Sequence, residues 1–222
     1  MILQLGVQQQ TIQNLPSAAH IDGIDLLLKG GWILVPIGII SLLSCYLIVV
    51  KFIEIKRYTK PEPNIVSAFH SYLRKGDLSQ AVATLKAGNS SYSRIFYHAT
   101  NSIGRPIKEV ESSIETAAQI ELNKMSKDLH YLGLFAGIAP MLGFIGTIAG
   151  VIKIFYDISL SDNISIGIIS GGLYQKMISS GLGLIVGVIA YTGYHILSIM
   201  IDKYMNRVEE DAFEFINIIE HN

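Results

Sequence analysis

Three stretches of the chain are long, apolar and nearly free of formal charge. The first covers 30–50 and the second about 129–152, neither with a charged residue, and the third covers 167–201 with Lys176 as its one charge. An α-helix rises 1.5 Å per residue, so about 20 apolar residues cross the roughly 30 Å hydrocarbon core of a bilayer. The pattern therefore predicts three transmembrane helices. The third is longer than a bilayer needs, so we expect it to tilt or to continue into the cytoplasm.

The connection between the first two spans repeats its apolar residues at helical spacing. One helix is predicted between the prolines at 61–63 and a turn at 76–77, and a second over 78–86. Ser93 is predicted to cap the helix that follows, and 104–106 forms another break. This connection therefore favours a set of short helices over an enzyme domain.

A longer helix is predicted from Ile107 onwards. Its apolar residues lie along one broad face, which we expect to pack against other cytoplasmic helices, while its charged residues, Glu121 among them, lie elsewhere. Neither proline nor glycine occurs between 107 and 132. We therefore expect one continuous helix that passes from the cytoplasm into the second span.

Together these elements predict an all-α integral membrane protein with three transmembrane helices and long helices that extend into a helical cytoplasmic region. In chain order, the predicted segments are a periplasmic N-terminal segment (1–29), the first span (30–50), a cytoplasmic helical loop (51–128), the second span (129–156), a short periplasmic loop (157–166), the third span (167–201) and a cytoplasmic C-terminal helix (202–222). In the last helix, the acidic run 209–211 is either a solvated face or an acidic binding site.

The charge distribution determines the predicted orientation. Only 16% of the residues are charged, against about 25% in soluble domains. Twelve Lys and Arg lie within 51–130, none within 157–166, one before the first span and two in the C-terminal tail. Because positive residues near span ends mark the cytoplasmic side, the N-terminus is predicted outside and the C-terminus inside.

Motifs for catalysis or for binding cofactors are absent from the sequence. There is no phosphate-binding loop, no His-Glu-x-x-His and no Cys/His cluster, and the six histidines are scattered singly. The one cysteine, Cys45, cannot form an intrachain disulfide. We therefore expect no enzyme activity, no metal or cofactor, and no nucleic-acid partner.

Small and polar residues line the second and third spans. The glycines with helix-packing spacing are Gly133, Gly137, Gly143, Gly146, Gly150, Gly183 and Gly187. Lys176 and Ser180 share a helix face, where Lys176 either faces a polar lumen or partner or extends towards the membrane surface. Thr147 and Ser180 either line a pore or hydrogen-bond to their own helices. The spans contain no Asp or Glu, so a proton-carrying carboxylate would have to come from another chain.

Two segments, Leu134–Gly150 and Met177–Gly187, resemble the family of ExbB, TolQ and the flagellar stator protein MotA. The first is similar to the family's run of Ala-Pro, Leu-Gly and Leu-Gly-Thr-Val, and the second to its Ala-Thr-Ala-x-Gly-Leu stretch. Three spans favour ExbB or TolQ over MotA, which has four. The resemblance implies a homopentamer around a pair of single-span helices resembling ExbD or TolR, with an Asp of that partner carrying protons.

The resemblance also implies roles for individual residues. Thr147 matches the family's threonine near the proton path, and Ser180 stands at its third-span threonine. Gln175 replaces a frequent glutamate beside Lys176, and Ile189 replaces a usual proline. Thr147, Ser180, Lys176 and Gln175 are therefore the candidate residues of the proton path.

Three functions agree with these observations. The first is an ExbB-like subunit of a motor in the bacterial inner membrane that couples the proton-motive force to TonB-dependent import across the outer membrane. The second is a TolQ-like subunit for envelope integrity. The third is a scaffold that assembles partner helices without conducting protons.

Overall fold

The computed structural model describes residues 32–160 and 166–221. In this part of the chain the regular elements are α-helices, with one isolated bridge between Ile103 and Arg105. The helices are α3 (Leu34–Tyr58), α4 (Pro63–Arg74), α5 (Leu78–Ala87), α6 (Ser91–Thr100), α7 (Ile107–Ser126), α8 (Leu129–Ser159) and α9 (Ile166–Glu220). Three of them, α3, α8 and α9, are long and apolar enough to cross a membrane. The predicted all-α fold with three spans is confirmed.

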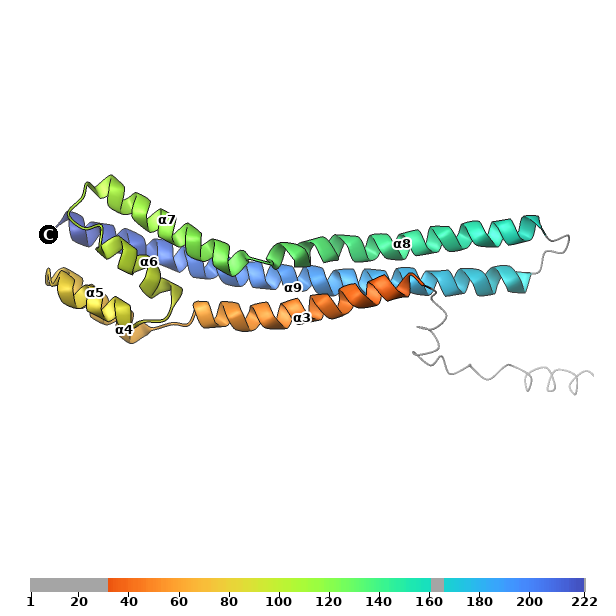
Figure 1. Cartoon of the computed structure of the whole chain (residues 1–222), viewed down its shortest axis with the longest axis horizontal. Coiled ribbons are helices and arrows are strands. Elements are labelled where there is room, and N and C mark those ends of the chain that lie inside the picture. The colour runs from red at the N-terminus through yellow and green to blue at the C-terminus, as the bar shows by residue number, and fades with distance from the viewer. Residues whose placement is uncertain (1–31, 161–165, 222) are drawn as a thin grey trace, which may run out of the picture.

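The three long helices lie side by side, and the shorter helices α4 to α7 gather around the C-terminal half of α9 (Figure 1). α3 runs parallel to α9 and antiparallel to α8. In the bundle of shorter helices, the rings of Phe69, Phe96 and Phe215 pack with centroids 5.7–5.9 Å apart. This aromatic cluster joins α4 and α6 to α9.

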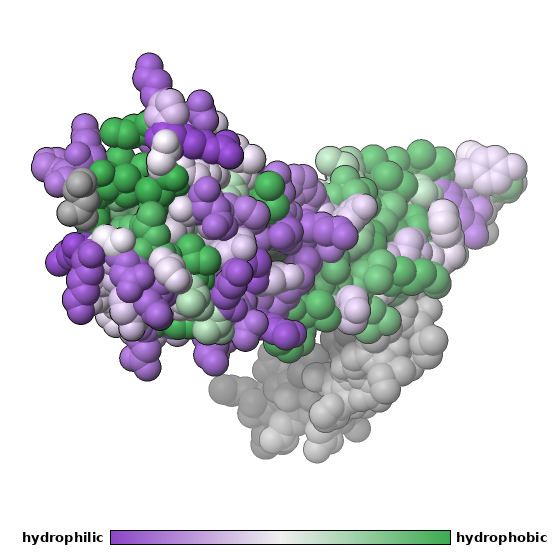
Figure 2. All heavy atoms as spheres, turned by 60° about the vertical axis from the view of Figure 1, so that its left-hand side comes forward, coloured by the Kyte–Doolittle hydropathy of each residue, from purple (hydrophilic) through white to green (hydrophobic). Residues whose placement is uncertain are grey.

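Hydrophilic and hydrophobic residues separate along the length of the molecule. Figure 2 shows hydrophilic side chains crowding the end that comes forward and hydrophobic side chains dominating the other end. On the long helices, large apolar side chains such as Leu42 and Met141 are exposed, whereas the residues buried between helices include several glycines. Small residues between membrane helices let the helix backbones approach closely. Large apolar residues on the outer faces can then contact lipid or other subunits.

The short helices begin and end close to the predicted positions. The turn at 76–77 is confirmed, and Gly76 adopts a φ of +72°, which a residue without a Cβ reaches at little cost. Asp77 caps α5 by accepting a hydrogen bond from the backbone N of Gln80 at 3.1 Å. Gly88 follows the last residue of α5, as expected for a helix C-terminus.

The cap of α6 differs from the prediction, which named Ser93. Ser90 is the capping residue, because it has an extended backbone and its hydroxyl accepts a hydrogen bond from the backbone N of Ser93. Ser93 lies one turn later, and its own hydroxyl donates to Glu62 at 3.1 Å. Glu62 also accepts from the Ser90 hydroxyl at 2.6 Å, so a carboxylate from the start of α4 holds the start of α6 in place.

The predicted continuous helix from 107 to 132 is wrong, because the chain breaks between α7 and α8. Asp128 lies between them with a φ of 68° in the left-handed region, which aspartate tolerates better than most residues. Its carboxylate lies 3.3 Å from the Nζ of Lys51, which is buried and also pairs with Glu54 at 2.6 Å. The break lets both Met125 of α7 and Leu129 of α8 enter the buried cluster against α3 and α9.

The strain at this break can be tested by substituting Asp128. Valine and glycine both lose the ion pair with Lys51, but only valine adds a β-branched side chain in the left-handed conformation. Asp128→Val should therefore be about 1–2 kcal/mol less stable than Asp128→Gly. Unfolding of both variants in mixed micelles measures this difference. Equal stability of the two would show that the backbone conformation carries no strain.

The third span and the C-terminal segment form one helix. α9 runs unbroken from Ile166 to Glu220 through both predicted segments, 167–201 and 202–222. Neither glycine nor proline occurs after Gly193, so nothing in the sequence interrupts the helix there. A single helix therefore joins the apolar end of the molecule to the bundle of shorter helices.

Candidate functional site

The backbones of α8 and α9 approach one another closely along a stripe of small residues, here called the seam (Gly143, Gly146, Thr147 and Gly150 of α8; Lys176, Ser179, Ser180, Gly183 and Gly187 of α9). A Cβ on Gly143 would lie 3.0 Å from the carbonyl oxygen of Ser179 and from the Cα of Ser180. A Cβ on Gly183 would lie 2.6 Å from the carbonyl oxygen of Ala139. A side chain at Gly183 would therefore force the two helices apart, and one at Gly143 would require the backbone of α9 to shift by a few tenths of an ångström.

Three other glycines of the seam accept side chains from neighbouring helices. A Cβ added to Gly146 would meet the side chain of Ile33, one on Gly187 would meet the ring of Pro140, and one on Gly150 would meet the side chain of Lys176. By contrast, Gly133 makes only ordinary contact with Tyr194, at 3.7 Å, and none of the described residues would come within 4 Å of a Cβ on Gly137. The structure thus brings five of the seven candidate packing glycines into the seam and leaves Gly133 and Gly137 outside it.

Thr147 bridges the two helices of the seam. Its hydroxyl lies 3.2 Å from the carbonyl oxygen of Gly143 in its own helix and 3.3 Å from the carbonyl oxygen of Lys176 in α9. One hydroxyl proton is shared between these two acceptors. The residue is half-buried, so part of its side chain still reaches the surface of the helix pair.

The polar side chains of α9 meet α8 over the same stretch. The Lys176 stem covers Gly150 so closely that a Cβ there would overlap its Cγ, Cδ and Cε atoms. Ser180 is half-buried opposite Gly143, whereas its neighbour Ser179 is almost fully buried. Thr147, Lys176 and Ser180 therefore lie together, while the side chain of Gln175 falls outside the described part of the structure. The burial of Ser179 follows from the register of α9 against α8.

A buried ion pair holds the shorter helices together. Glu121, expected away from the apolar face of α7, is instead 3% exposed on that face. Its carboxylate accepts hydrogen bonds from Arg94 of α6, at 3.0 Å from Nε, and from Lys124, at 2.7 Å. Burial would raise the pKa of Glu121, but hydrogen bonds from these two cations outweigh it and lower the pKa to about 2. The two cations explain why a carboxylate can occupy a buried position.

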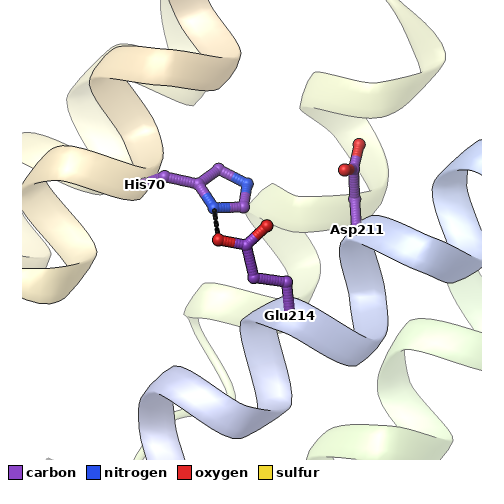
Figure 3. A group of neighbouring side chains, drawn as sticks. All are labelled: His70, Asp211 and Glu214. Atoms are coloured by element: carbon purple, nitrogen blue, oxygen red, sulfur yellow. Dashed lines mark ion pairs between the residues drawn. The ribbon is translucent and has the colours of Figure 1, made fainter.

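Within the described residues, one group has the composition to hold a metal ion. His70 of α4 and Glu214 of α9 face one another, and Asp211 of α9 lies beside them (Figure 3). One ligand atom from each residue lies within 4.8 Å of the other two. Of the acidic run 209–211, Glu209 and Glu210 are exposed and Asp211 is half-buried. His70 and Asp211 are far apart in the sequence, so inspection of singly placed histidines could not find this group.

The arrangement of the seam permits hydrogen bonding and charge stabilisation but supplies no intramembrane acid. Its polar groups are hydroxyls and one lysine, and the three predicted spans contain no Asp or Glu. Hydroxyls can bind water or a partner's carboxylate, whereas proton transfer inside membranes commonly uses carboxylates. The predicted spans thus contain hydroxyls and a lysine at the seam but no carboxylate.

The comparisons with known proteins agree with this description. The model of the MotA/TolQ/ExbB proton channel family matches residues 87–210, more than half of the chain. The chain is 29% identical over 147 residues to a putative biopolymer transport protein ExbB homolog of Methanothermobacter thermautotrophicus, covering 66% of this chain and 52% of the relative. It is 26% identical over 164 residues to a putative biopolymer transport protein ExbB-like 3 of Synechocystis, covering 72% and 78%.

A more distant relative has a Tol-system name. The chain is 23% identical over 111 residues to the Tol-Pal system protein TolQ of Haemophilus influenzae, covering 50% of this chain and 47% of the relative. The chain spans about half the length of several of the curated relatives it matches. The match of the family model, the three apolar helices and the small-residue seam confirm the resemblance seen in the sequence: the chain belongs to the MotA/TolQ/ExbB proton channel family, a family of non-enzymatic membrane transport components.

Proposed function

We propose that this chain is the multi-span subunit of an ExbB-like proton-driven motor in the bacterial inner membrane. One observation carries the proposal: α8 and α9 form a polar seam around Thr147, Lys176 and Ser180, yet none of the three predicted spans contains an Asp or Glu. A single-span partner, ExbD-like in its Asp-bearing helix, would supply the missing carboxylate. The polar seam would then line the path along which that carboxylate exchanges its proton.

The exposed faces of the long helices support assembly into a homo-oligomer. Large apolar side chains such as Phe144, Ile148 and Ile185 project from α8 and α9 away from the seam. Thr147, Lys176 and Ser180 are half-buried, so a helix inserted between subunits can reach them. We propose that five copies of the chain assemble around two partner helices. The N-terminus would then be periplasmic, and the shorter helices and the C-terminus would be cytoplasmic. A TonB-like protein would transmit the energy of proton flow to the outer membrane.

The test of the proton path uses the double variant Thr147→Val, Ser180→Ala. Both changes remove hydroxyls and keep the approximate side-chain volume, so assembly should persist while proton flux falls at least tenfold. The measurement is proton flux into liposomes that contain the chain and its single-span partner. Thr192→Val is the matched control, because Thr192 is exposed elsewhere on α9. Undiminished flux in an intact double variant would show that the hydroxyls of Thr147 and Ser180 do not form the proton path. Absence of flux from the unmodified complex would favour a scaffold that does not conduct protons.

Native mass spectrometry tests the assembly separately. The detergent-purified chain should form a pentamer and take up two copies of the Asp-bearing partner. A monomer or dimer that binds no such partner would remove the enclosed path. Deletion of the gene then distinguishes the two motor systems: an ExbB-like role predicts loss of energy-dependent uptake, and a TolQ-like role predicts loss of envelope integrity.

A further inference from the structure

The cleft between α4 and the C-terminal part of α9 contains a group of side chains that the proton-path proposal does not use. The cleft has a volume of 730 Å³, and His70, Asp211 and Glu214 are among the residues that line it. Asp211 and Glu214 are three residues apart and therefore project from the same face of α9. His70 faces them from α4, so the group joins two helices that are distant in the sequence (Figure 3).

We propose that His70, Asp211 and Glu214 form a binding site for a divalent transition-metal ion, best suited to Zn²⁺, that fastens α4 to α9. Imidazole nitrogen and carboxylate oxygen are ordinary zinc ligands, at about 2.0–2.2 Å from the metal. Ligand atoms around a tetrahedral ion lie about 3.3 Å apart at these bond lengths. The present separations of up to 4.8 Å therefore close with side-chain adjustments of about 1 Å. Water would complete the coordination.

The contacts of His70 leave its Nδ1, the ring nitrogen that faces Glu214, available to bind a metal ion. The Nε2 of His70 lies 3.2 Å from the hydroxyl of Tyr92, and its Nδ1 lies 3.3 Å from Oε1 of Glu214. A hydrogen bond at one ring nitrogen fixes the orientation of a metal-binding histidine and leaves the other nitrogen for the ion. Tyr92 is buried, so this outer contact is held by the core of the bundle.

The charges around the group favour a bound cation. Burial raises the pKa of Asp211, the nearby His70 opposes this, and the negative charges of Glu214 and Glu210 raise it further. Within the described residues, no hydrogen bond or ion pair reaches the Asp211 carboxylate. Arg74 pairs with Glu214 at 2.7 Å, but its side chain is 65% exposed and can turn towards water when an ion takes its place. A divalent ion would neutralise both carboxylates at once.

The experiment uses the full chain in detergent, purified without a histidine tag and stripped of metal with a chelator. Calorimetric titration with ZnCl₂ should give one equivalent per chain, and Co²⁺ should give visible absorption bands of a site with nitrogen and oxygen ligands. His70→Ala and the near-isosteric Asp211→Asn should each weaken Zn²⁺ binding at least tenfold. Circular dichroism establishes that these variants retain their helices.

Two substitutions serve as matched controls. His98→Ala removes an exposed histidine of α6, and Glu209→Gln removes an exposed carboxylate two residues before Asp211. Both should bind Zn²⁺ as the unmodified chain does. Absence of stoichiometric Zn²⁺ and Co²⁺ binding, or equal binding by the ligand and control variants, would show that the group is only an ion pair. The titration needs no partner protein, so its result is independent of the test of proton flux.

Discussion

Replacing Gly183 with leucine is expected to prevent the chain from forming its native helix bundle. A Cβ at this position would lie 2.6 Å from the carbonyl oxygen of Ala139 and 3.1 Å from the Cα of Gly143. Both are backbone atoms, so no side-chain rotation relieves the clash, and α8 and α9 would have to separate. Overpacking costs about 1–3 kcal/mol in cores whose side chains can adjust. We expect at least the upper end of this range here.

Gly181 provides the matched control for this substitution. It lies two residues away on the exposed side of α9, and none of the described residues would come within 4 Å of its Cβ. Unfolding by SDS titration, followed by circular dichroism, should place Gly181→Leu near the unmodified chain and Gly183→Leu far below it. Native mass spectrometry should show assembly for the first variant only. Equal stability of the two variants would contradict the close packing of the seam.

The second large effect is expected from Glu121→Gln, which removes the buried negative charge between Arg94 and Lys124. Folding lowers the pKa of Glu121 from its usual 4.5 to about 2. Each pKa unit is equivalent to about 1.4 kcal/mol, so the ionised carboxylate stabilises the folded chain by about 3 kcal/mol. Breaking one side of a buried ion pair has a cost of this order. We therefore expect Glu121→Gln to lower the free energy of unfolding by about 3 kcal/mol at neutral pH.

The effect of Glu121→Gln should depend on pH in a defined direction. Because folding lowers the pKa of Glu121, its ionised form stabilises the chain above pH 4.5, and this stabilisation is lost as the pH falls from 4.5 towards 2. The stability difference between the two proteins should thus be constant at neutral pH and narrow in acid. Chemical unfolding at several pH values measures it.

Glu115→Gln is the control for the charge change itself. Glu115 also lies on α7 but is exposed to solvent. A surface carboxylate contributes little to stability, typically less than about 1 kcal/mol. Losses of similar size from Glu115→Gln and Glu121→Gln would show that burial of the ion pair is not what stabilises the bundle.

Some expectations from the sequence failed at particular residues. Glu121 was assigned to the polar side of its helix because it is charged, yet Arg94, 27 positions away, neutralises it on the buried side. Asp128 was placed inside a continuous helix because no proline or glycine marked a break. Its left-handed conformation is instead held by packing of α7 and α8 against α3 and α9 and by the ion pair with Lys51. Neither interaction is visible in the local sequence.

The sequence by itself determined the all-α class, the three long apolar helices and the family. These depend on the length and composition of single segments and on a local motif, because a helix that crosses a bilayer must be apolar over its own length. Only the tertiary structure decided which glycines meet a backbone, that Thr147 reaches the carbonyl of Lys176, and that His70 faces Asp211 and Glu214. Such contacts depend on how helices distant in the sequence are aligned against one another, and the periodicity of one helix does not specify the register of its neighbour.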